Sequence, residues 1–452
     1  MQPDGKLREI RVGLIGCGVV GGGLVKMLAR HAGQLAANGL AFRVTHVAVR
    51  DTAKSRGVDL SGARVCANPM DVAADPDINM LVEVMGGNDI AVIAACAALT
   101  RGIPLVTANK HALARSLPRY LEAAGGRVPI GFEAAVAAHI PIIEVLEHSL
   151  GCEDLTLVKG VINGSTNYIL TFMERAGCEY DAALADAAAK GFTEADPTLD
   201  VEGFDAAEKL SLLALKAFGT PVALERMHIE GVTNIRQVDI RLALELEHRI
   251  KLVAAARRVD GGLSLRVHPA LVHRGELLAD VDSEFNAIIL EGPGFNQLTF
   301  LGKGAGELPT ASAVLNDMVK IARGGTGQLP GIDRGPALPL ADTGNLRLCY
   351  FLRMRAEAAD SSALVASLEG MGLKVLSIAR TTLDETNYLG VITDVVEESR
   401  MVGLLPGIRA LPQVKGDLAL LRLDKDNYRD IVEREQSAYF GASLKRQPGP
   451  RI

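Results

Sequence analysis

Residues 10–21 read IRVGLIGCGVVG, a short apolar run that ends in spaced glycines. A GxGxxG pattern that directly follows a strand and opens a helix is typical of a dinucleotide-binding loop. Gly16 would permit the tight turn, Gly18 would let a pyrophosphate approach the backbone, and Gly21 would let the helix pack closely on the strand. The amides at the start of the helix would then face the anion. The stretch therefore predicts a nucleotide-binding unit rather than glycines that only end a strand.

The segments around this loop continue an alternation of strands and helices. Apolar runs typical of buried strands occupy residues 41–49, 80–85, 103–107 and 128–132. The segments at about 90–101 and 111–124 and the one near 141–150 have helical periodicity. Alternating strands and helices predict βαβ units and a parallel sheet. We therefore expect an α/β fold with a Rossmann-type parallel-sheet nucleotide domain over residues 1–148.

The pattern changes after residue 155. Strand-like runs at 155–162, 251–259, 263–267 and 287–290 surround helices collected between about 166 and 219. This predicts an α+β domain with an open sheet over 149–306, and a helix over about 307–323 that completes the first domain. A Gly- and Pro-rich linker over 324–344 then precedes strand-like and helix-like segments in a βαββαβ order over 345–425. Residues 426–452 are expected to form a polar tail.

The end of the second strand discriminates between the two nicotinamide dinucleotides. An acidic residue there binds the ribose 2′-hydroxyl of NAD, whereas an arginine suits the 2′-phosphate of NADP. The chain reads Arg50-Asp51, with Lys54 and Arg56 close behind. Three cations around one acid favour NADP as the cofactor, with NAD as the alternative. A charged, solvated turn is the structural alternative.

Composition limits the class of partner. The 452 residues have a formal net charge of −6, are 48% hydrophobic and only 4% aromatic, and include no Trp. Such a chain can bury a large core, but it lacks the basic blocks and aromatic faces with which proteins bind nucleic acid. No apolar run reaches the ~18 residues that a membrane helix needs. We expect a small-molecule partner, with neither nucleic acid nor membrane.

Cysteine usage and the start of the chain indicate the compartment. The six cysteines are dispersed and include no CxxC pair. The first residues are polar and charged, and the apolar run that follows is broken by glycines, which is not typical of a signal peptide. These features predict a reduced, cytoplasmic setting.

The most informative stretch is acidic. Residues 187–209 read AAAKGFTEADPTLDVEGFDAAEK, with carboxylates far outnumbering lysines. A helix is expected from Gly203 onward, and it would place Asp205 and Lys209 on one face, since they are four residues apart. One interpretation is a surface ion pair. The other is a site that binds an ammonium through carboxylates and protonates an oxygen through a lysine.

The same stretch resembles the signature of the homoserine dehydrogenase family. The matching positions are Ala187, Gly191-Phe192-Thr193, Asp196-Pro197, Asp200-Val201, Gly203, Asp205 and Lys209. Val106-Thr107-Ala108-Asn109-Lys110 resembles a second segment of the family, and residues 160–168 and 302–317 resemble two more. The resemblance covers nearly the whole chain. Its last part, 345–425, is similar to the ACT ligand-binding module often fused to these enzymes.

The resemblance implies reversible, NAD(P)H-dependent reduction of L-aspartate 4-semialdehyde to L-homoserine, in the pathway to threonine and methionine. By position, Lys209 resembles the proton donor and Lys110 the lysine between nicotinamide and substrate. Glu194 resembles the residue that binds the substrate amino group, supported by Asp200 and Asp205. Hydride attack on a carbonyl builds an alkoxide, which a nearby ammonium stabilises and protonates. Asp205 would help Lys209 keep its proton, so Lys110 is an alternative donor.

Further site residues follow from the same comparison. Asn163 and Thr166 are expected to contact the substrate, or else to cap the helix that begins there. The expected cofactor-binding positions are Gly16, Gly18, Val19, Val20, Gly21, Arg50, Lys54, Gly86, Gly87, Thr107, Lys110 and Gly306. The resemblance also implies a structural Na⁺ or K⁺ held mainly by the backbone carbonyls of Glu133, Val136, Ala138 and Ile140.

Two departures from the family keep alternatives open. His139 stands where the family has glycine, beside the cation loop, and it supports a related oxidoreductase acting on another amino-acid aldehyde or ketone. Glu357 to Ser362 replaces the usual Asp-x-x-Gly turn of the ACT module, so the module either binds threonine as an inhibitor or serves assembly alone. A non-catalytic nucleotide or amino-acid sensor is a third hypothesis, against which the retained lysines and carboxylates argue. The family implies a homodimer or homotetramer.

Overall fold

The first part of the chain forms a parallel sheet in the computed structural model, which describes residues 7–87, 89–260, 262–329, 331, 333–356 and 361–424. The strand order is β3-β2-β1-β4-β5-β6, and each neighbouring pair is parallel. These strands are β1 (Arg8–Ile15), β2 (Leu40–Ala48), β3 (Arg64–Cys66), β4 (Met80–Glu83), β5 (Leu105–Thr107) and β6 (Ile130–Gly131). This is the doubly wound order of dinucleotide-binding domains, so the predicted Rossmann-type sheet is confirmed.

Helices pack on both faces of this sheet, because successive residues of its strands point to opposite sides. Leu14 and Val82 share a hydrophobic core with residues of two helices, α1 (Val19–Ala37) and α12 (Glu307–Ala322). Ile15 and Leu81 lie in a core on the other side. That core also contains residues of α2 (Pro69–Ala73), α3 (Asp89–Thr100) and α4 (Lys110–Ala124).

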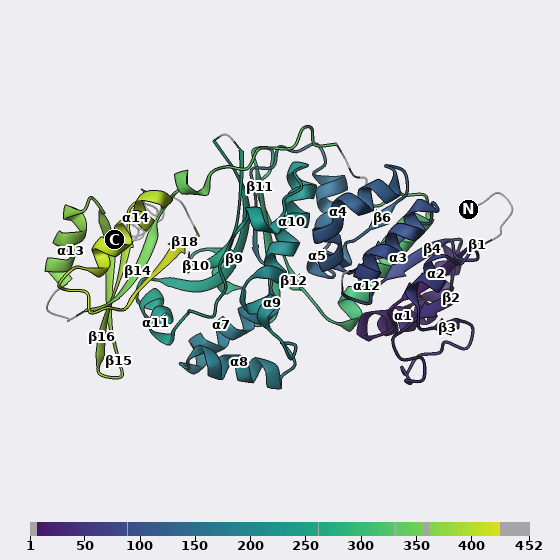
Figure 1. Cartoon of the computed structure of the whole chain (residues 1–452), viewed down its shortest axis with the longest axis horizontal. Coiled ribbons are helices and arrows are strands. Elements are labelled where there is room, and N and C mark those ends of the chain that lie inside the picture. Colours follow the sequence, from purple (N-terminus) through teal and green to yellow (C-terminus); the bar gives the residue numbers. More distant parts are fainter. Residues whose placement is uncertain are drawn as a thin grey trace, which may run out of the picture.

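Helix α12 comes from far along the chain, yet it lies beside α1 (Figure 1). A glycine in α1 permits this approach: a Cβ on Gly23 would lie 2.9 Å from Glu307 Cγ. Lys26 of α1 also pairs with Glu307, with 2.7 Å between the charged atoms. The chain thus returns to the first sheet after it has built the second.

The second sheet is mixed and has ten strands in the described part of the chain. Its order is β12-β11-β7-β9-β10-β18-β14-β16-β15, with β8 beside β10. The strands before residue 306 are β7 (Leu157–Val161), β8 (His228–Ile229), β9 (His248–Val259), β10 (Gly262–His273), β11 (Phe285–Gly292) and β12 (Asn296–Lys303). Nearby helices are α7 (Gly164–Ala176), α8 (Tyr180–Ala189), α9 (Thr198–Val201), α10 (Phe204–Phe218) and α11 (Gln237–Glu245). Leu252 and Ala254 of β9 share a core with Leu210 and Leu213 of α10.

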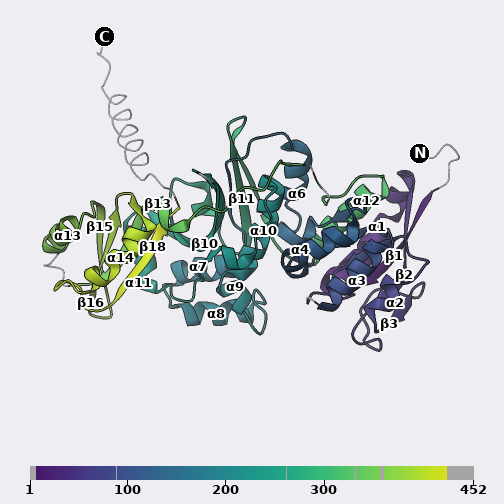
Figure 2. The same cartoon turned by 45° about the horizontal axis from the view of Figure 1, so that its top comes forward.

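The last part of the chain extends this second sheet. Its elements are β14 (Tyr350–Arg355), α13 (Ser361–Gly370), β15 (Val375–Leu383), β16 (Thr386–Thr393), α14 (Glu398–Arg409) and β18 (Leu418–Leu423), a βαββαβ order. β13 (Arg347–Leu348) and β17 (Val396–Glu397) form a separate pair. β18 pairs in parallel with β10, where Ala270 faces Arg422 and Leu271 faces Leu423. Strands from before and after the linker therefore belong to one sheet, and Figure 2 shows β10 and β18 side by side.

The structure differs from the sequence-based expectations at several elements. The segment near 141–150 is not one regular helix: it contains α6 (Ile142–Glu144) and a π-helical turn, η1 (Val145–Ser149). β10 runs well past the predicted 263–267, although Pro269 lies within it. Pro269 has no N–H to donate, and β18 begins to pair only at Ala270. β12, an exposed edge strand, and α11 were not predicted at all.

The structure does not test the expectations for the C-terminal tail and for the replaced ACT turn. The predicted tail, 426–452, and residues 357–360 of the replaced ACT turn lie outside the described residues. Within the described residues, no helix is long and apolar enough to cross a membrane. All six cysteines are free thiols.

Candidate active site

A cavity of about 880 Å³ opens where segments that follow strands of the first sheet meet segments of the second. Its lining residues are Ala108, Lys110, 134–136, 163–165, 191–194, Asp200, Asp205, Lys209, Glu284 and 303–310. Most of the residues expected to act in catalysis and substrate binding therefore line one space.

The first turns of α10 carry the central ion pair. Gly203, with φ of +84°, precedes the helix and turns the chain into it. Lys209 donates from Nζ to Asp205 Oδ2 at 2.7 Å and to the backbone oxygen of Ile162 at 2.8 Å. The predicted contact between residues four apart is confirmed. It is not a surface pair, because both residues are buried.

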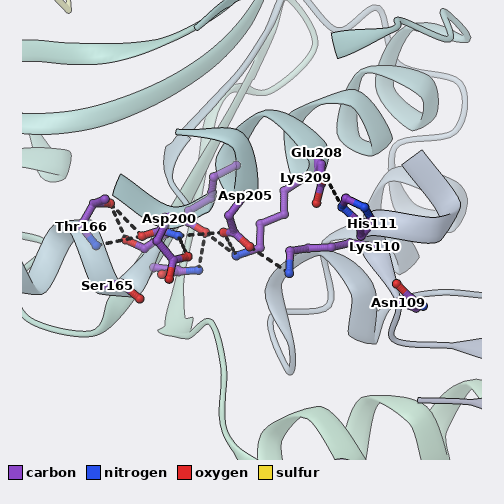
Figure 3. A network of polar contacts seen from close by, with 12 residues as sticks. Asn109, Lys110, His111, Ser165, Thr166, Asp200, Asp205, Glu208 and Lys209 are labelled. Carbon is purple, nitrogen blue, oxygen red and sulfur yellow. Dashed lines mark hydrogen bonds and ion pairs between the residues drawn. The ribbon is translucent and has the colours of Figure 1, made fainter. Parts of the chain in front are cut away.

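Lys110 brings a second ammonium to the same carboxylate (Figure 3). It is the first residue of α4, which Asn109 caps by accepting from the Ala112 amide. Lys110 Nζ lies 2.9 Å from Asp205 Oδ1, so each oxygen of Asp205 faces one lysine. Lys110 and Asp205 are far apart in the sequence, and only the packing of α4 near α10 joins them.

This pairing sets the charges in the site. Burial alone would raise the pKa of Asp205, but the two ammonium groups and the Asn163 amide outweigh burial and hold that pKa well below its usual range. The Asp205 charge in turn raises the pKa of Lys110, against the opposing effect of burial. Asp205 is therefore anionic at neutral pH, and Lys110 keeps its proton.

Asn163 orients two of the carboxylates. Its Nδ2 donates to Asp200 Oδ1 at 2.7 Å and to Asp205 Oδ2 at 2.9 Å. Its Oδ1 accepts from the Thr166 amide and hydroxyl, each at 2.8 Å, and so caps α7. The expected cap is thus confirmed, and Asn163 also lines the cavity, where the contact with a substrate stays a prediction. Thr166 is fully buried behind Asn163 and does not line the cavity.

Asp200 and Glu194 line the acidic side of the cavity. Burial, followed by the nearby charge of Asp205, raises the pKa of Asp200. Glu194 is exposed on the loop after α8. Contacts with α7 hold this loop in place. Ser165 Oγ donates to the Phe192 backbone oxygen at 2.6 Å, and the Phe192 and Tyr168 ring centroids are 4.4 Å apart. Glu194 is thus free to meet a ligand while its loop is held.

The glycine loop has the geometry expected for a dinucleotide. Gly16 has φ of +95°, and a Cβ there would lie 2.6 Å from Met85 Cα. A Cβ on Gly21 would lie 2.1 Å from the Gly16 oxygen. Gly18, in contrast, has no described atom within 4 Å of its Cβ position, and Val19 beside it is exposed. Two glycines are therefore needed inside the fold, and the third leaves open space at the start of α1 where a pyrophosphate would fit.

The other cofactor candidates differ in exposure. Arg50 and Lys54 are exposed after β2, while Arg56 is folded back onto the Asp51 backbone oxygen. Val20 is half-buried, and Gly86 and Gly87 are exposed with positive φ after β4. Gly306, with φ of +129°, lies at the start of α12 on the cavity wall.

Thr107 is fully buried and takes part in a network that sequence reasoning missed. Its hydroxyl donates to Glu83 Oε2 at 3.0 Å and accepts from the Asn109 amide at 3.0 Å. Glu83, whose pKa burial raises, also accepts from the Met85 amide, and Asn109 donates to the Gly87 oxygen. Thr107 therefore shapes two cofactor-side loops rather than reaching the cavity. The signal that could have revealed Glu83 is an acid at the end of a buried apolar run.

The segment expected to hold a cation is buried except at His139. The Glu133 carboxylate accepts from the Ile143 and Glu144 amides at 2.9 and 2.8 Å, and its backbone oxygen accepts from the Val136 amide at 3.3 Å. Ala138 has φ of +48°, an uncommon conformation for a residue with a Cβ. Val136 and Ile140 lie on either side of it along the chain. Carbonyl oxygens on a buried turn are suitable donors for a hard monovalent cation.

His139 does not line the cavity beside Asp205. It is exposed and lines a different space, of about 660 Å³, together with Met27, Arg30 and residues 299–303. It therefore does not narrow the space around Asp205, as the sequence had suggested it could.

Comparisons with known proteins match both the part of the chain with the first sheet and the part that follows it. The model for "Homoserine dehydrogenase, NAD binding domain" matches residues 16–126, and the model for "Homoserine dehydrogenase" matches residues 141–319. The chain is 33% identical to the homoserine dehydrogenase of Pseudomonas aeruginosa, over 93% of this chain and 100% of that one. A crystal structure of a homoserine dehydrogenase from Thiobacillus denitrificans is 35% identical, with a TM-score of 0.86, over 93% of this chain and 100% of that one. A hyperthermophilic archaeal homoserine dehydrogenase mutant in complex with NADPH is 26% identical, with a TM-score of 0.59, over 69% of this chain and 97% of that one.

Proposed function

The chain belongs to the homoserine dehydrogenase family, and we propose that the cavity beside Asp205 is where its reaction takes place. The protein is an NAD(P)-dependent oxidoreductase of amino-acid biosynthesis, and it interconverts L-aspartate 4-semialdehyde and L-homoserine. The observation that carries the assignment of the site is the Asp205 carboxylate held between the ammonium groups of Lys209 and Lys110.

Two lysines beside one carbonyl would serve different needs of the reaction. NAD(P)H, when bound, supplies the hydride. Hydride addition to the aldehyde carbon leaves an alkoxide, which the ammonium groups stabilise electrostatically. Lys110 has a raised pKa and retains its proton, so it acts as a fixed positive charge. Lys209 delivers the proton to the alkoxide oxygen, and Asp205 holds both side chains in place.

The carboxylates of Glu194 and Asp200 would bind the substrate amino group. Both line the cavity, and an amino acid carries its ammonium at the end away from the semialdehyde carbonyl. Asn163 supports this arrangement by fixing Asp200 and Asp205 relative to each other. Thr166 supports it indirectly, by fixing Asn163. The alternative of another amino-acid aldehyde or ketone is not favoured, because His139, its only support, lies in another cavity.

Arg50 and Lys54 would give the enzyme a preference for NADP over NAD. Both are exposed at the end of β2, where the ribose 2′-position is bound in this fold. The archaeal relative crystallised with NADPH supports the phosphate-bearing cofactor. Equal kcat/KM values for NADPH and NADH would contradict this preference.

The same proposal includes a structural Na⁺ or K⁺ at the turn formed by residues 133–140. The carbonyl groups of Glu133, Val136, Ala138 and Ile140 would hold the ion beside the cavity wall at 134–136. Thermal stability and turnover would then depend on the monovalent cation in the buffer. Identical values in Na⁺, K⁺ and tetramethylammonium salts would contradict it.

The division of the chain and its assembly complete the proposal. We assign 1–148 with 307–323 to the nucleotide domain, 149–306 to the catalytic and dimerisation domain, and 345–425 to an ACT-like module after the linker 324–344. The exposed edge strand β12 lies at the end of the open sheet, which supports a homodimer or homotetramer. The dispersed cysteines, all free thiols, support a cytoplasmic setting. Analytical ultracentrifugation tests the assembly, and threonine titration of turnover decides between an inhibitory and a purely structural module.

A steady-state assay of wild type, Lys209→Ala and Lys110→Ala, with NADPH and with NADH, tests the central proposal. We expect wild type to oxidise NADPH in the presence of aspartate semialdehyde and Lys209→Ala to lose nearly all turnover. If Lys209→Ala kept normal turnover and only Lys110→Ala fell to residual activity, Lys110 would be the proton donor and Lys209 the fixed charge. If wild type showed no turnover, the hypothesis of a non-catalytic nucleotide or amino-acid sensor would be favoured instead.

A further inference from the structure

A second carboxylate of α10 lies one residue before Lys209 and has no part in the reaction described above. Glu208 is buried, with a side chain only 2% exposed. Its Oε1 accepts from His111 Nδ1 at 2.6 Å and from Arg115 Nε at 3.2 Å. Both partners belong to α4, so Glu208 reaches across from the catalytic helix to the helix that begins with Lys110 (Figure 3).

The two helices are thus joined at two neighbouring points. On α4, Lys110 and His111 are consecutive, and Arg115 lies one turn beyond His111 on the same side. On α10, Asp205 and Glu208 are three residues apart and share a face. The Lys110–Asp205 ion pair and the His111–Glu208 hydrogen bond therefore bridge the same gap, and a shift of α4 would break both.

The two bridges differ in stiffness. The side chains of Lys110 and His111 are similarly exposed, at 33% and 31%, but Lys110 has a long side chain, which costs considerable rotamer entropy to hold in one place. His111 has a short, flat side chain, and it meets an acceptor that is shielded from water. A buried carboxylate that loses its partners is strongly unfavourable, so Glu208 resists any movement that takes α4 away.

We propose that Glu208 is a positioning residue for the reaction. Through His111 and Arg115 it fixes the first turn of α4 against α10, and so keeps Lys110 Nζ at the substrate carbonyl. This inference rests on the role proposed for Lys110 above. It also predicts that Glu208 affects turnover only through Lys110, since Glu208 does not line the cavity.

A double-mutant cycle on kcat tests this dependence. Glu208→Ala should lower kcat by roughly tenfold to a hundredfold, because a small misplacement of a catalytic group is costly. In a Lys110→Ala background the same substitution should lower kcat by no more than about twofold. Glu208→Gln, which can still accept from His111, should recover part of the loss. Equal factors in both backgrounds would overturn the proposal.

A measurement on Lys110 itself provides a readout besides activity. Acylation of Lys110 by a succinimidyl ester, followed by mass spectrometry, reports how firmly Asp205 holds its ammonium. We expect faster labelling in Glu208→Ala and in His111→Ala than in wild type, and unchanged labelling would contradict the proposal. If Lys110→Ala had wild-type kcat, the role of Lys110 would be wrong, and labelling would still decide whether Glu208 positions it.

A matched control separates positioning from general loss of a buried charge. Glu147→Gln removes another buried carboxylate that pairs with α10, at Lys216. This variant should have wild-type kcat per folded molecule and wild-type labelling of Lys110. If Glu147→Gln lowered kcat or accelerated labelling as much as Glu208→Gln does, any weakened ion pair on α10 would suffice, and the proposal would fail.

Discussion

Helix α10 carries two buried lysines that each pair with a carboxylate, and the two pairs differ in their surroundings. Near its start, Lys209 pairs with Asp205 on the wall of the 880 Å³ cavity, and Lys110 shares the carboxylate. Near its end, Lys216 contacts Glu147 of η1 and donates to the Gln328 backbone oxygen at 2.6 Å. The first pair faces a space that a ligand can enter, and the second joins three segments of the protein interior.

The comparison shows that a perturbed pKa alone does not identify a catalytic lysine. Burial lowers the pKa of Lys216, with the Glu147 carboxylate opposing it. Strongly shifted groups are candidates for function, yet structural ion pairs shift pKa values as well. What distinguishes the Asp205 pair is access to a cavity and a second ammonium on the same carboxylate.

The largest difference between the two pairs should be in turnover. Lys209→Ala should lower kcat by a factor of about 10²–10⁴, the usual loss when a positioned proton donor is removed. Lys216→Ala should leave kcat per folded molecule close to wild type. Steady-state kinetics with the folded fraction measured by circular dichroism checks both. Comparable kcat losses in the two variants would remove the distinction.

Stability should respond in the opposite order. Lys216→Ala removes the lysine that pairs with the buried Glu147, and we expect a loss of about 3 kcal/mol in the free energy of unfolding, since the Arg334 charge nearby still faces Glu147. Lys209→Ala should cost less, because Asp205 keeps Lys110 and the Asn163 amide as partners. Urea unfolding followed by fluorescence or circular dichroism measures the difference. A larger loss in Lys209→Ala would show that the catalytic pair also carries the fold.

Alkaline pH should separate Lys110 from Lys216 by sign. The pKa of Lys110 is raised in the folded protein, so its stabilising contribution is complete below the usual lysine pKa of about 10.4 and is lost as pH rises through the raised value. The pKa of Lys216 is lowered, so the unfolded chain binds more protons and stability rises with pH as the usual value is approached from below.

Urea unfolding of wild type, Lys110→Met and Lys216→Met between about pH 8 and pH 11 tests these signs. The advantage of wild type over Lys110→Met should persist until the top of this range. Relative to Lys216→Met, wild type should gain stability with increasing pH. Parallel pH dependences in the three proteins would contradict the assignment.

The smallest effect concerns the Asn163 amide, which donates to Asp205 of the Asp205–Lys209 pair. Asn163→Ala removes the cap of α7 and should lower the free energy of unfolding by about 1 kcal/mol. It should also lower kcat, because Asp200 and Asp205 lose their shared donor. Asn68→Ala, which removes the equivalent cap of α2, should cause a similar loss of stability at unchanged kcat. Equal kcat values in both variants would assign Asn163 to capping alone.

Local spacing explains what could be predicted from the sequence. The glycine loop and the Asp205–Lys209 pair depend on residues a few positions apart on one element, and a helix fixes their relation. The first sheet followed from its alternation of buried runs and helices.

Long-range packing explains what was missed. The contact of Lys110 with Asp205 and that of His111 with Glu208 require α4 and α10 to pack together, and no periodicity encodes this. β12 is an edge strand that is largely exposed and mixes polar and apolar residues. Its sequence therefore lacks the apolar run that would predict a buried strand. The pairing of β18 with β10 is equally hidden, because Pro269 argues against a long central strand.

That pairing has a consequence for how the protein unfolds. β10 is held by β9 on one side and by β8 and β18 on the other, and buried charges cross the same boundary, where Arg266 and Arg422 both bind Glu398. A chain without the residues after the linker would leave Arg266 without the Glu398 carboxylate and would leave the end of β10 without its neighbour β18. The part of the chain after residue 345 should therefore unfold in one cooperative transition with the sheet that carries the candidate active site.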